Sequence, residues 1–360
     1  MTFLAPVIIL FAVLGAIDYV IGNKFGIGEE FKKAFMLLGT MALPMIGMIV
    51  IAPLIGDVLS PVFEFTYNFL HIEPSIIPAS LFSNDMGGAP LAKEIAKNQS
   101  VGMFNALVVS SMMGATISFT IPLAISVVGK DRHNEMLLGF LCGIVTIPIG
   151  CFVSGLVCGI HIISLLLNLL PLLIFSVIIA FGLIKAPNLC VKIFKIFAIF
   201  MTVVIMIGLL MGIVNFLLGK ELIKGIAPIE EGAMVCFNAC IVMCGMFPLL
   251  NIISRLLKKP LKFLGAKSGI NDVSALGFIS TLATNVTTFD MMDKMDKKGV
   301  LLNSAFAVSA SFTFAGSLAF TVAFEPSYLL PVIIGKITAG VFAIVVSGYV
   351  YKFTIREKIA

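Results

Sequence analysis

The sequence predicts an all-α polytopic membrane protein, and three observations lead to this fold class. Of its 360 residues, 59% are hydrophobic and 12% are charged, about half of the ~25% charged residues of an ordinary soluble domain. The mean hydropathy of +1.12 excludes intrinsic disorder as well. The apolar residues form unbroken runs such as 196–214, unlike the alternating pattern of an outer-membrane barrel, so we expect the spans to be helices.

Nine apolar segments reach the ~20 residues that a helix needs to cross the hydrocarbon core. In chain order they are 3–22, 35–57, 101–128, 136–159, 163–184, 190–218, 233–254, 300–324 and 329–351. No basic residue precedes the first of them, and Asp18 lies within it. We therefore expect this segment to remain as a span rather than to be a cleaved signal peptide.

Two further segments, 74–98 and 270–298, begin apolar and then break into polar residues. This pattern predicts re-entrant or discontinuous helices. Irregular backbone at membrane depth is tolerated only where it lines a cavity or is buried in protein. The sequence thus predicts about nine spans together with two broken segments.

The basic residues indicate how the chain is oriented. With the N-terminus outside and both broken segments returning to the side they came from, 19 of the 24 lysines and arginines face inward. The five on the outer side are Lys93, Lys97, Lys220, Lys224 and Lys336. Basic residues concentrate on the cytoplasmic side of membrane proteins. The prediction is a multi-pass protein of the bacterial cytoplasmic membrane with its N-terminus outside and its C-terminus inside.

The two broken segments enter from opposite sides in this topology, and their sequences are distantly alike. The stretch 81–84 (Leu-Phe-Ser-Asn) corresponds to 282–285 (Leu-Ala-Thr-Asn). Paired breaks of opposite topology are typical of inverted-repeat transporters, although chance similarity between small-residue-rich segments is the alternative. We expect one transport domain over 1–360, with broken-helix halves at 1–130 and 233–360 joined by connecting helices at 136–218.

The first break carries the strongest candidate site. Asn84 and Asp85 precede Gly87 and Gly88, and the glycines permit a tight turn or a close backbone approach. A helix ending near Asn84 directs its carbonyl groups at the break. Together with the carboxylate of Asp85 these carbonyls form a candidate cation site, because an intramembrane carboxylate usually has a functional partner. Helix capping by Asp85 in a solvated loop is the alternative.

The second break offers amide and hydroxyl oxygens. Thr284 and Asn285 are the site candidates because the apolar run fails there, whereas Asp290 fits better as the start of a solvated polar run. Asp18 lies near the inner end of the first span, where an interfacial position and a transport role are both open.

Other classes of function find little support. The seven cysteines fit small packing residues better than a thiol metal site, so we expect neither metal nor cofactor. No catalytic motif of a protease, hydrolase, P-loop or dinucleotide enzyme is present, which predicts that the protein is not an enzyme. Basic residues do not interleave with aromatic ones, so nucleic acid is not an expected partner. The sequence allows a homo-oligomer without indicating one.

Several of these stretches, taken in order, resemble the ethanolamine-utilisation membrane protein family (EutH). The residues that carry the resemblance are Asp85–Gly88 with Leu91–Glu94, Ser111–Gly114, Gly143–Cys151, Thr281–Ala283 with Asn285, Met295–Gly299 and Phe306–Ala310. The resemblance covers nearly the whole chain and implies uptake of ethanolamine across a bacterial inner membrane. Asp85, Gly87, Gly88 and Asn285 match the family's two breaks, whereas Asn84 and Asp290 depart from its pattern.

The candidate site suits this substrate, whose amine is protonated at neutral pH, like that of lysine. Asp85 with exposed carbonyls would bind the ammonium, Asn285 and Thr284 the hydroxyl, and Phe289 would offer a cation–π face.

Two alternatives remain. One is an ion- or proton-coupled permease for another small amine or a nucleoside. The other is a non-transporting sensor or scaffold that docks a partner on the basic stretch 255–267, for which anchoring to membrane lipids is a simpler explanation.

Overall fold

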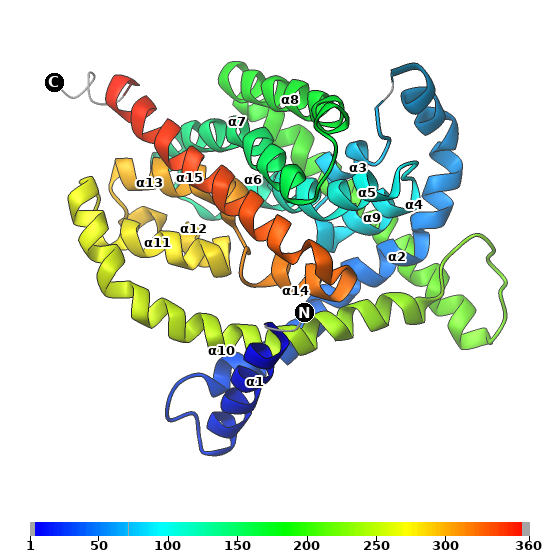
Figure 1. Ribbon diagram of the computed structural model, residues 1–360, viewed down its shortest axis with the longest axis horizontal. Helices are drawn as coiled ribbons and strands as arrows, with labels where there is room; N and C mark the ends of the chain where they lie inside the picture. The colour runs from blue at the N-terminus through cyan, green and yellow to red at the C-terminus, as the bar shows by residue number, and fades with distance from the viewer. Residues whose placement is uncertain (1–3, 71, 355–360) are drawn as a thin grey trace.

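The protein is an all-helical bundle, described for residues 4–70 and 72–354 by a computed structural model, with only the backbone given for a few stretches such as 257–268. Seven helical stretches in this part are long and apolar enough to cross a membrane. Six belong to α2 (Gly28–Leu70), α7 (His133–Val157), α8 (Ile162–Lys185), α9 (Pro187–Leu218), α10 (Ile229–Ser268) and α15 (Leu329–Thr354) (Figure 1).

The seventh stretch is a composite helix over 99–127. It consists of α5 (Gln99–Phe104), the π-helices η2 (Asn105–Gly114) and η3 (Thr116–Thr120), and α6 (Ile121–Val127). Asn98 caps its start by accepting hydrogen bonds from the amides of Ser100 and Val101. The wider π-turns interrupt the ordinary hydrogen-bond ladder in mid-span, and such turns are frequent at functional sites.

Three predicted elements differ in the structure. The segment 3–22 forms α1 (Leu4–Val20), which is only 17 residues long. The segment 300–324 is two helices, α13 (Lys297–Ala310) and α14 (Gly316–Phe324), separated by a break at 311–315. Helix α10 continues to Ser268 through the stretch predicted as a basic inner loop, although most side chains of that stretch lie outside the described residues. The number of spans therefore stays a prediction.

Both broken segments form helical hairpins whose two ends lie together. The first contains α3 (Ile76–Leu81), the 3₁₀ turn η1 (Asn84–Met86) and α4 (Gly88–Glu94). At its base the carboxylate of Glu73 accepts hydrogen bonds from the amides of Lys97 (2.8 Å) and Asn98 (3.0 Å). The chain therefore leaves this segment beside the point where it entered, as a re-entrant segment requires.

The second hairpin contains α11 (Asp272–Ala283), α12 (Asn285–Asp290) and the 3₁₀ turn η5 (Met292–Lys294). Its base is also closed by a carboxylate, because Asp296 accepts hydrogen bonds from the amide of Asn271 (2.9 Å) and the hydroxyl of Ser274 (2.8 Å). The two hairpins occupy opposite sides of the view in Figure 1. This arrangement agrees with paired halves, whose inverted symmetry stays a prediction.

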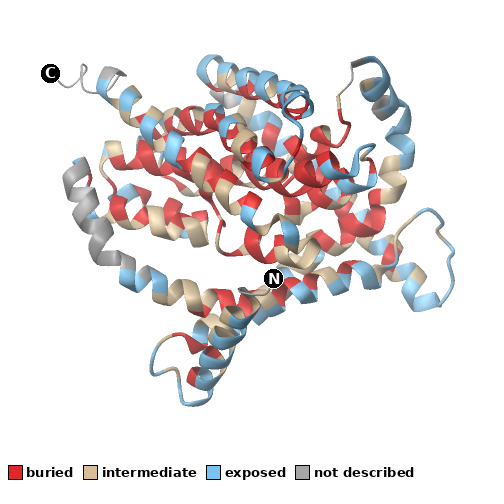
Figure 2. Ribbon diagram, in the orientation of Figure 1, coloured by how far each residue is buried: buried red, intermediate tan, exposed pale blue. Residues whose placement is uncertain are grey.

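The core lies in the middle of the bundle, where α13 and α15 pack against α7 (Figure 2). Small residues allow this close packing: a side chain at Gly139 or Gly143 of α7 would collide with the backbone of α13. In contrast, α8 exposes large apolar side chains such as Leu166, Leu170 and Ile174. An apolar surface of this kind is suited to lipid rather than to water.

Candidate functional site

The tip of the first hairpin brings a carboxylate into the bundle. Helix α3 ends at Leu81, and the chain then turns through η1 to Gly87, whose φ of +102° belongs to the left-handed region. The carboxylate of Asp85 accepts a hydrogen bond of 2.5 Å from the hydroxyl of Ser83. Asn84 is buried, and its Nδ2 has no hydrogen-bond partner among the described residues. The tip therefore holds a carboxylate and a spare amide donor.

The tip of the second hairpin presents a spare acceptor. Thr284 is extended between α11 and α12, and its hydroxyl caps α12 at the amide of Val286 (3.3 Å). Asn285 is fully buried and donates from Nδ2 to the hydroxyl of Thr120 (3.1 Å). Its Oδ1 is buried with no partner in the described part of the chain. An unpaired buried amide oxygen is costly and marks a candidate ligand position.

A third break, which the sequence analysis did not predict, lies beside the second tip. At 311–315 the amides of Phe312 and Phe314 donate to the carbonyls of Thr281 (3.1 Å) and Leu282 (3.0 Å) at the end of α11. Phe312 has a φ of +59°, a conformation that a bulky residue adopts only when its surroundings hold it there. The break therefore depends on the second hairpin.

The π-helix η3 contacts both hairpin tips and the last turn of α13 through hydroxyl groups on alternate residues. Thr116 donates to the carbonyl of Val308, the last but two residue of α13 (2.8 Å). Ser118 accepts from the amide of Ser83 in the first tip (3.1 Å), and Thr120 accepts from Asn285 in the second. A single helical segment thus contacts both hairpin tips and the end of α13, just before the third break.

Lys336 adds a buried positive charge near the first tip. It lies in α15 with 1% of its surface exposed, and its Nζ donates to the carbonyl of Ser111 in η2 (2.6 Å). Because η2 packs against η1, this bond places Lys336 on the side of η2 and η1 where the first tip lies. The sequence analysis placed Lys336 on the outer side, which is wrong. Its position seven residues inside a predicted span was the signal that could have identified it.

Asp18 and Phe289 lie away from the hairpin tips, the first in a turn and the second in the core. Asp18 is buried in the turn between α1 and α2, where its carboxylate accepts three amide hydrogen bonds of 2.8 Å, from Phe25, Ile27 and Gly28. Phe289 packs edge-to-face against Phe140 in the core, with the ring centroids 6.2 Å apart. The structure thus brings six of the eight predicted site residues to the hairpin tips and places these two elsewhere.

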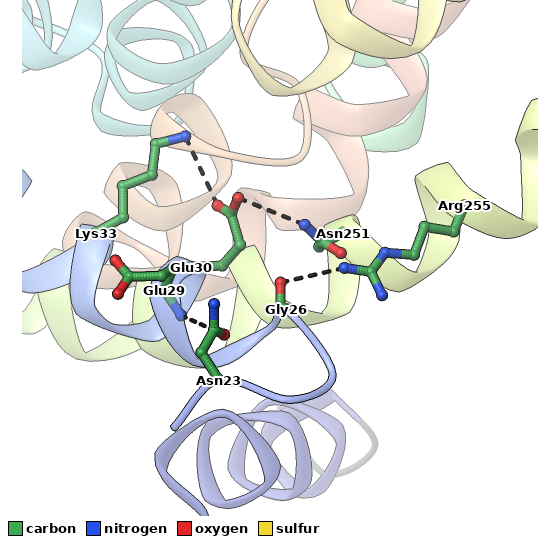
Figure 3. Close-up of polar contacts among 7 residues, drawn as sticks. All are labelled: Asn23, Gly26, Glu29, Glu30, Lys33, Asn251 and Arg255. Carbon is green, nitrogen blue, oxygen red and sulfur yellow. Dashed lines mark hydrogen bonds and ion pairs between the residues drawn. The ribbon is translucent and has the colours of Figure 1, made fainter. Parts of the chain in front are cut away.

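The polar contacts around the α1–α2 turn join it to α10 (Figure 3). Arg255 donates to the carbonyls of Phe25 (2.6 Å) and Gly26 (3.2 Å), and Glu30 accepts from Asn251 (3.4 Å) and pairs with Lys33 (3.6 Å). An open pocket of about 620 Å³ lies beside this network and includes Asp18 and Arg255 in its lining. These contacts stabilise the fold at this end of the bundle.

A second open pocket, of about 610 Å³, lies where the start of α5 meets the short turn η6 (Pro326–Tyr328). Its lining includes Asn98, Ser100, Glu325 and Tyr328. The hydroxyl of Tyr328 joins the two segments by donating to the carbonyl of Ser100 (3.0 Å). Neither of these two pockets includes a residue of the hairpin tips.

Two of the cysteines pack where α10 crosses α2. Cys236 lies against Met45, and Cys240 against the carbonyl of Ala34, where α10 crosses α2. Within residues 4–70 and 72–354 no group of three or more His, Cys, Asp or Glu side chains is placed to hold a metal ion.

Comparison with known proteins places the chain among bacterial membrane proteins. The model of the family described as "Ethanolamine utilisation protein, EutH" matches residues 2–350. A "Probable ethanolamine permease EutH" of Listeria monocytogenes is 40% identical over 341 residues, which are 95% of this chain and 91% of the relative. That of Salmonella typhimurium is 38% identical, covering 89% and 84%. An "Uncharacterized protein YxeR" of Bacillus subtilis is 35% identical, covering 94% and 92%. No solved structure matches the chain significantly.

Proposed function

Because the chain belongs to the EutH family of ethanolamine utilisation proteins, we propose that it carries ethanolamine across the bacterial cytoplasmic membrane. Relatives that carry the name of probable ethanolamine permease support transport of this compound rather than an enzymatic activity. The helices of spanning length support a multi-pass membrane protein.

One observation carries the proposal, namely that η3 holds both hairpin tips together. Ethanolamine has an ammonium group at one end and a hydroxyl at the other. We assign the ammonium to the carboxylate of Asp85, since charge-assisted hydrogen bonds are the stronger kind. The hydroxyl would donate to Oδ1 of Asn285, which has no partner in the described residues, and would meet Thr284 beside it.

The other residues of the first tip shape this site. Gly87 and Gly88 allow the tight turn that presents Asp85, and Nδ2 of Asn84 is a spare donor next to it. In the proposed orientation the N-terminus is outside and the C-terminus inside. The halves 1–130 and 233–360 would then rock about the paired tips, as in inverted-repeat transporters.

Uptake by purified protein in liposomes tests the proposal. Vesicles that contain the protein should take up labelled ethanolamine faster than protein-free vesicles. Excess choline or nucleoside should leave uptake unchanged. The proposed site offers one carboxylate for a primary ammonium group and one small amide group for the hydroxyl of ethanolamine. Absence of protein-dependent uptake, or stronger inhibition by choline or nucleosides than by unlabelled ethanolamine, would contradict the proposal.

Asp85→Asn provides the residue-level test. The amide keeps the size of the side chain but removes its charge, so ethanolamine binding should weaken by on the order of 100-fold. Asp290→Asn is the matched control, because Asp290 is exposed at the end of α12 and should bind like the wild type. Equal binding by the Asp85→Asn protein would remove Asp85 from the site.

A further inference from the structure

Lys336 is a buried cation that the proposed binding of ethanolamine leaves unexplained. A charged side chain inside a membrane protein is expensive and usually has a functional partner. Lys336 is 1% exposed in α15, and a single carbonyl, that of Ser111, accepts its hydrogen bond. One neutral acceptor does not neutralise an ammonium group, so the compensating charge must come from elsewhere.

Asp85 is the carboxylate that can supply this charge. Lys336 bonds to Ser111 in η2, and η2 packs against η1, the turn that carries Asp85. In the described part of the chain the electrostatic partners of Lys336 are Asp85 and the thiol of Cys151 in α7, and only Asp85 is a carboxylate. Asp85 and Lys336 form no ion pair within 4.0 Å among the described residues. The carboxylate is instead held by Ser83, which leaves it open to a second cation.

Adding the substrate creates a conflict of charge. The empty site holds one carboxylate and one ammonium and is neutral as a pair. A protonated amine bound at Asp85 would make two cations against one anion, in surroundings of low dielectric where like charges repel strongly. Neutrality returns when Lys336 loses one proton to water, since lysine readily changes its protonation state in buried sites. No other bond forms or breaks in this step.

Resting on the proposed function, we infer that Lys336 is the internal counter-ion of Asp85, and that the ammonium of the substrate binds Asp85 in exchange for the proton of Lys336. Both the empty and the loaded site are then neutral, which allows either form to change conformation within the membrane. Ethanolamine uptake becomes an exchange of one substrate cation for one proton.

Proton release on binding tests this inference directly. Purified wild-type protein in weakly buffered detergent is mixed with ethanolamine hydrochloride between pH 5.5 and 8.5, and a pH-sensitive dye reports the protons. The wild type should release up to one proton for each ethanolamine bound. Its affinity should fall by about tenfold per pH unit on the acidic side, because only the fraction with neutral Lys336 is competent to bind.

Three variants identify the side chain that releases the proton. Lys336→Arg keeps a permanent charge, so it should bind at least about tenfold more weakly at all these pH values and should release no proton. Lys336→Met leaves Asp85 without its counter-ion, so Asp85 should take up a proton in the empty site, and the variant should still bind ethanolamine. Cys151→Ser should retain the proton release of the wild type. Thermal unfolding in detergent checks that each variant is folded. If Lys336→Met is not folded, the titration of the wild type alone tests the inference.

The outcomes separate this inference from the proposed function. If the wild type does not bind ethanolamine at any pH, both are overturned. If it binds without releasing protons, only the inference on Lys336 is overturned. The same holds if Lys336→Arg binds ethanolamine as tightly as the wild type and releases a proton, which would assign the proton to another group. It also holds if Lys336→Met is folded and cannot bind, which would place Lys336 in contact with the substrate.

Discussion

At the scale of single residues, the first hairpin tip depends on glycine as much as on its carboxylate. Gly87 has a φ of +102°, and the side chain of Met48 fills the space where a Cβ would lie. Gly88 lies directly against the carbonyl of Phe82. The chain can therefore reverse between α3 and α4 within a few residues, which places Asp85 at the tip.

Gly87→Ala should destabilise the protein and weaken ethanolamine binding. A left-handed backbone costs a residue other than glycine about 1–3 kcal/mol, and the displaced Met48 adds to this. The matched control is Gly39→Ala in α2, where a Cβ would meet nothing within 4 Å and helix propensity favours alanine by about 1 kcal/mol. Thermal unfolding in detergent compares the two. An unchanged melting temperature for Gly87→Ala would show that the tip tolerates a side chain.

The sequence predicts the residues that interrupt an apolar run better than those buried within one. Asp85, Gly87 and Asn285 stand out because polar residues and glycines fail to continue a span, and the structure places them at the tips. Lys336 was missed because its basic side chain was counted with the outer residues. Asp18 and Phe289 have the right chemistry for a site, but only tertiary contacts reveal that they cap a turn and fill the core.

At the scale of elements, a carboxylate closes the base of each hairpin. Glu73 does so from the entering end of the first hairpin, and Asp296 from the leaving end of the second. In both cases the carboxylate accepts from a backbone amide across the base. These bonds fix the ends of each hairpin to one another, while its tip is held by η3. Each hairpin is therefore closed at its base and attached to η3 at its tip.

Glu73 should make the stability of the first hairpin depend on pH. Burial raises the pKa of Glu73 above its ordinary value of 4.5, and hydrogen bonds from Lys97 and Asn98 offset part of this rise. A carboxyl with a raised folded-state pKa stabilises fully below the unfolded pKa, and this contribution is lost as pH rises through the folded pKa. The free energy of unfolding should therefore fall as pH rises above 4.5.

Thermal unfolding of the wild type and of Glu73→Gln between about pH 4 and pH 7 measures this dependence. The loss of stability with rising pH should be smaller in Glu73→Gln, which cannot ionise. Glu64→Gln, at an exposed position of α2, should follow the wild type. Parallel curves for the wild type and Glu73→Gln would show that Glu73 does not contribute to the dependence.

Elements set by local hydrophobicity were predictable, and elements set by tertiary contacts were not. Helices α8 and α9 and the start of α15 fall within three residues of their predicted bounds. The break at 311–315 has no proline or charge to mark it. It exists because the amides of Phe312 and Phe314 bond to the end of α11 instead of continuing α13. Such competition between helix and tertiary partners leaves no periodic signal in the sequence.

At the scale of the whole molecule, polar contacts group the loops in agreement with the charge-based topology. The amide of Gly129 donates to Asp293 (3.3 Å), and Glu135 pairs with Lys297 (3.8 Å). All four belong to loops or helix ends assigned to the inner side. At the other end, Tyr328 bonds to Ser100, and both were assigned to the outer side. With Lys336 inside the bundle, four of the five outer basic residues remain there.

Cysteine labelling in intact cells tests which end faces outward. Ser327 and Lys294 are both exposed, the first in η6 at the proposed outer pocket and the second in η5 at the base of the second hairpin. We expect a membrane-impermeant maleimide to label Ser327→Cys in intact cells, and Lys294→Cys only after permeabilisation, because the lipid bilayer separates the two ends. Cys158 and Cys190, the native cysteines that are not buried, are first replaced by serine.

The pattern of labelling distinguishes the possible topologies. The reverse pattern would place the C-terminal end of the bundle outside and would mean that the whole chain has the opposite orientation in the membrane. Labelling of both positions in intact cells would mean that the chain crosses the membrane once fewer or once more between 294 and 327. That result would contradict the prediction that α13 and α14 together form one broken span, which would carry the chain from the second hairpin to the pocket at η6.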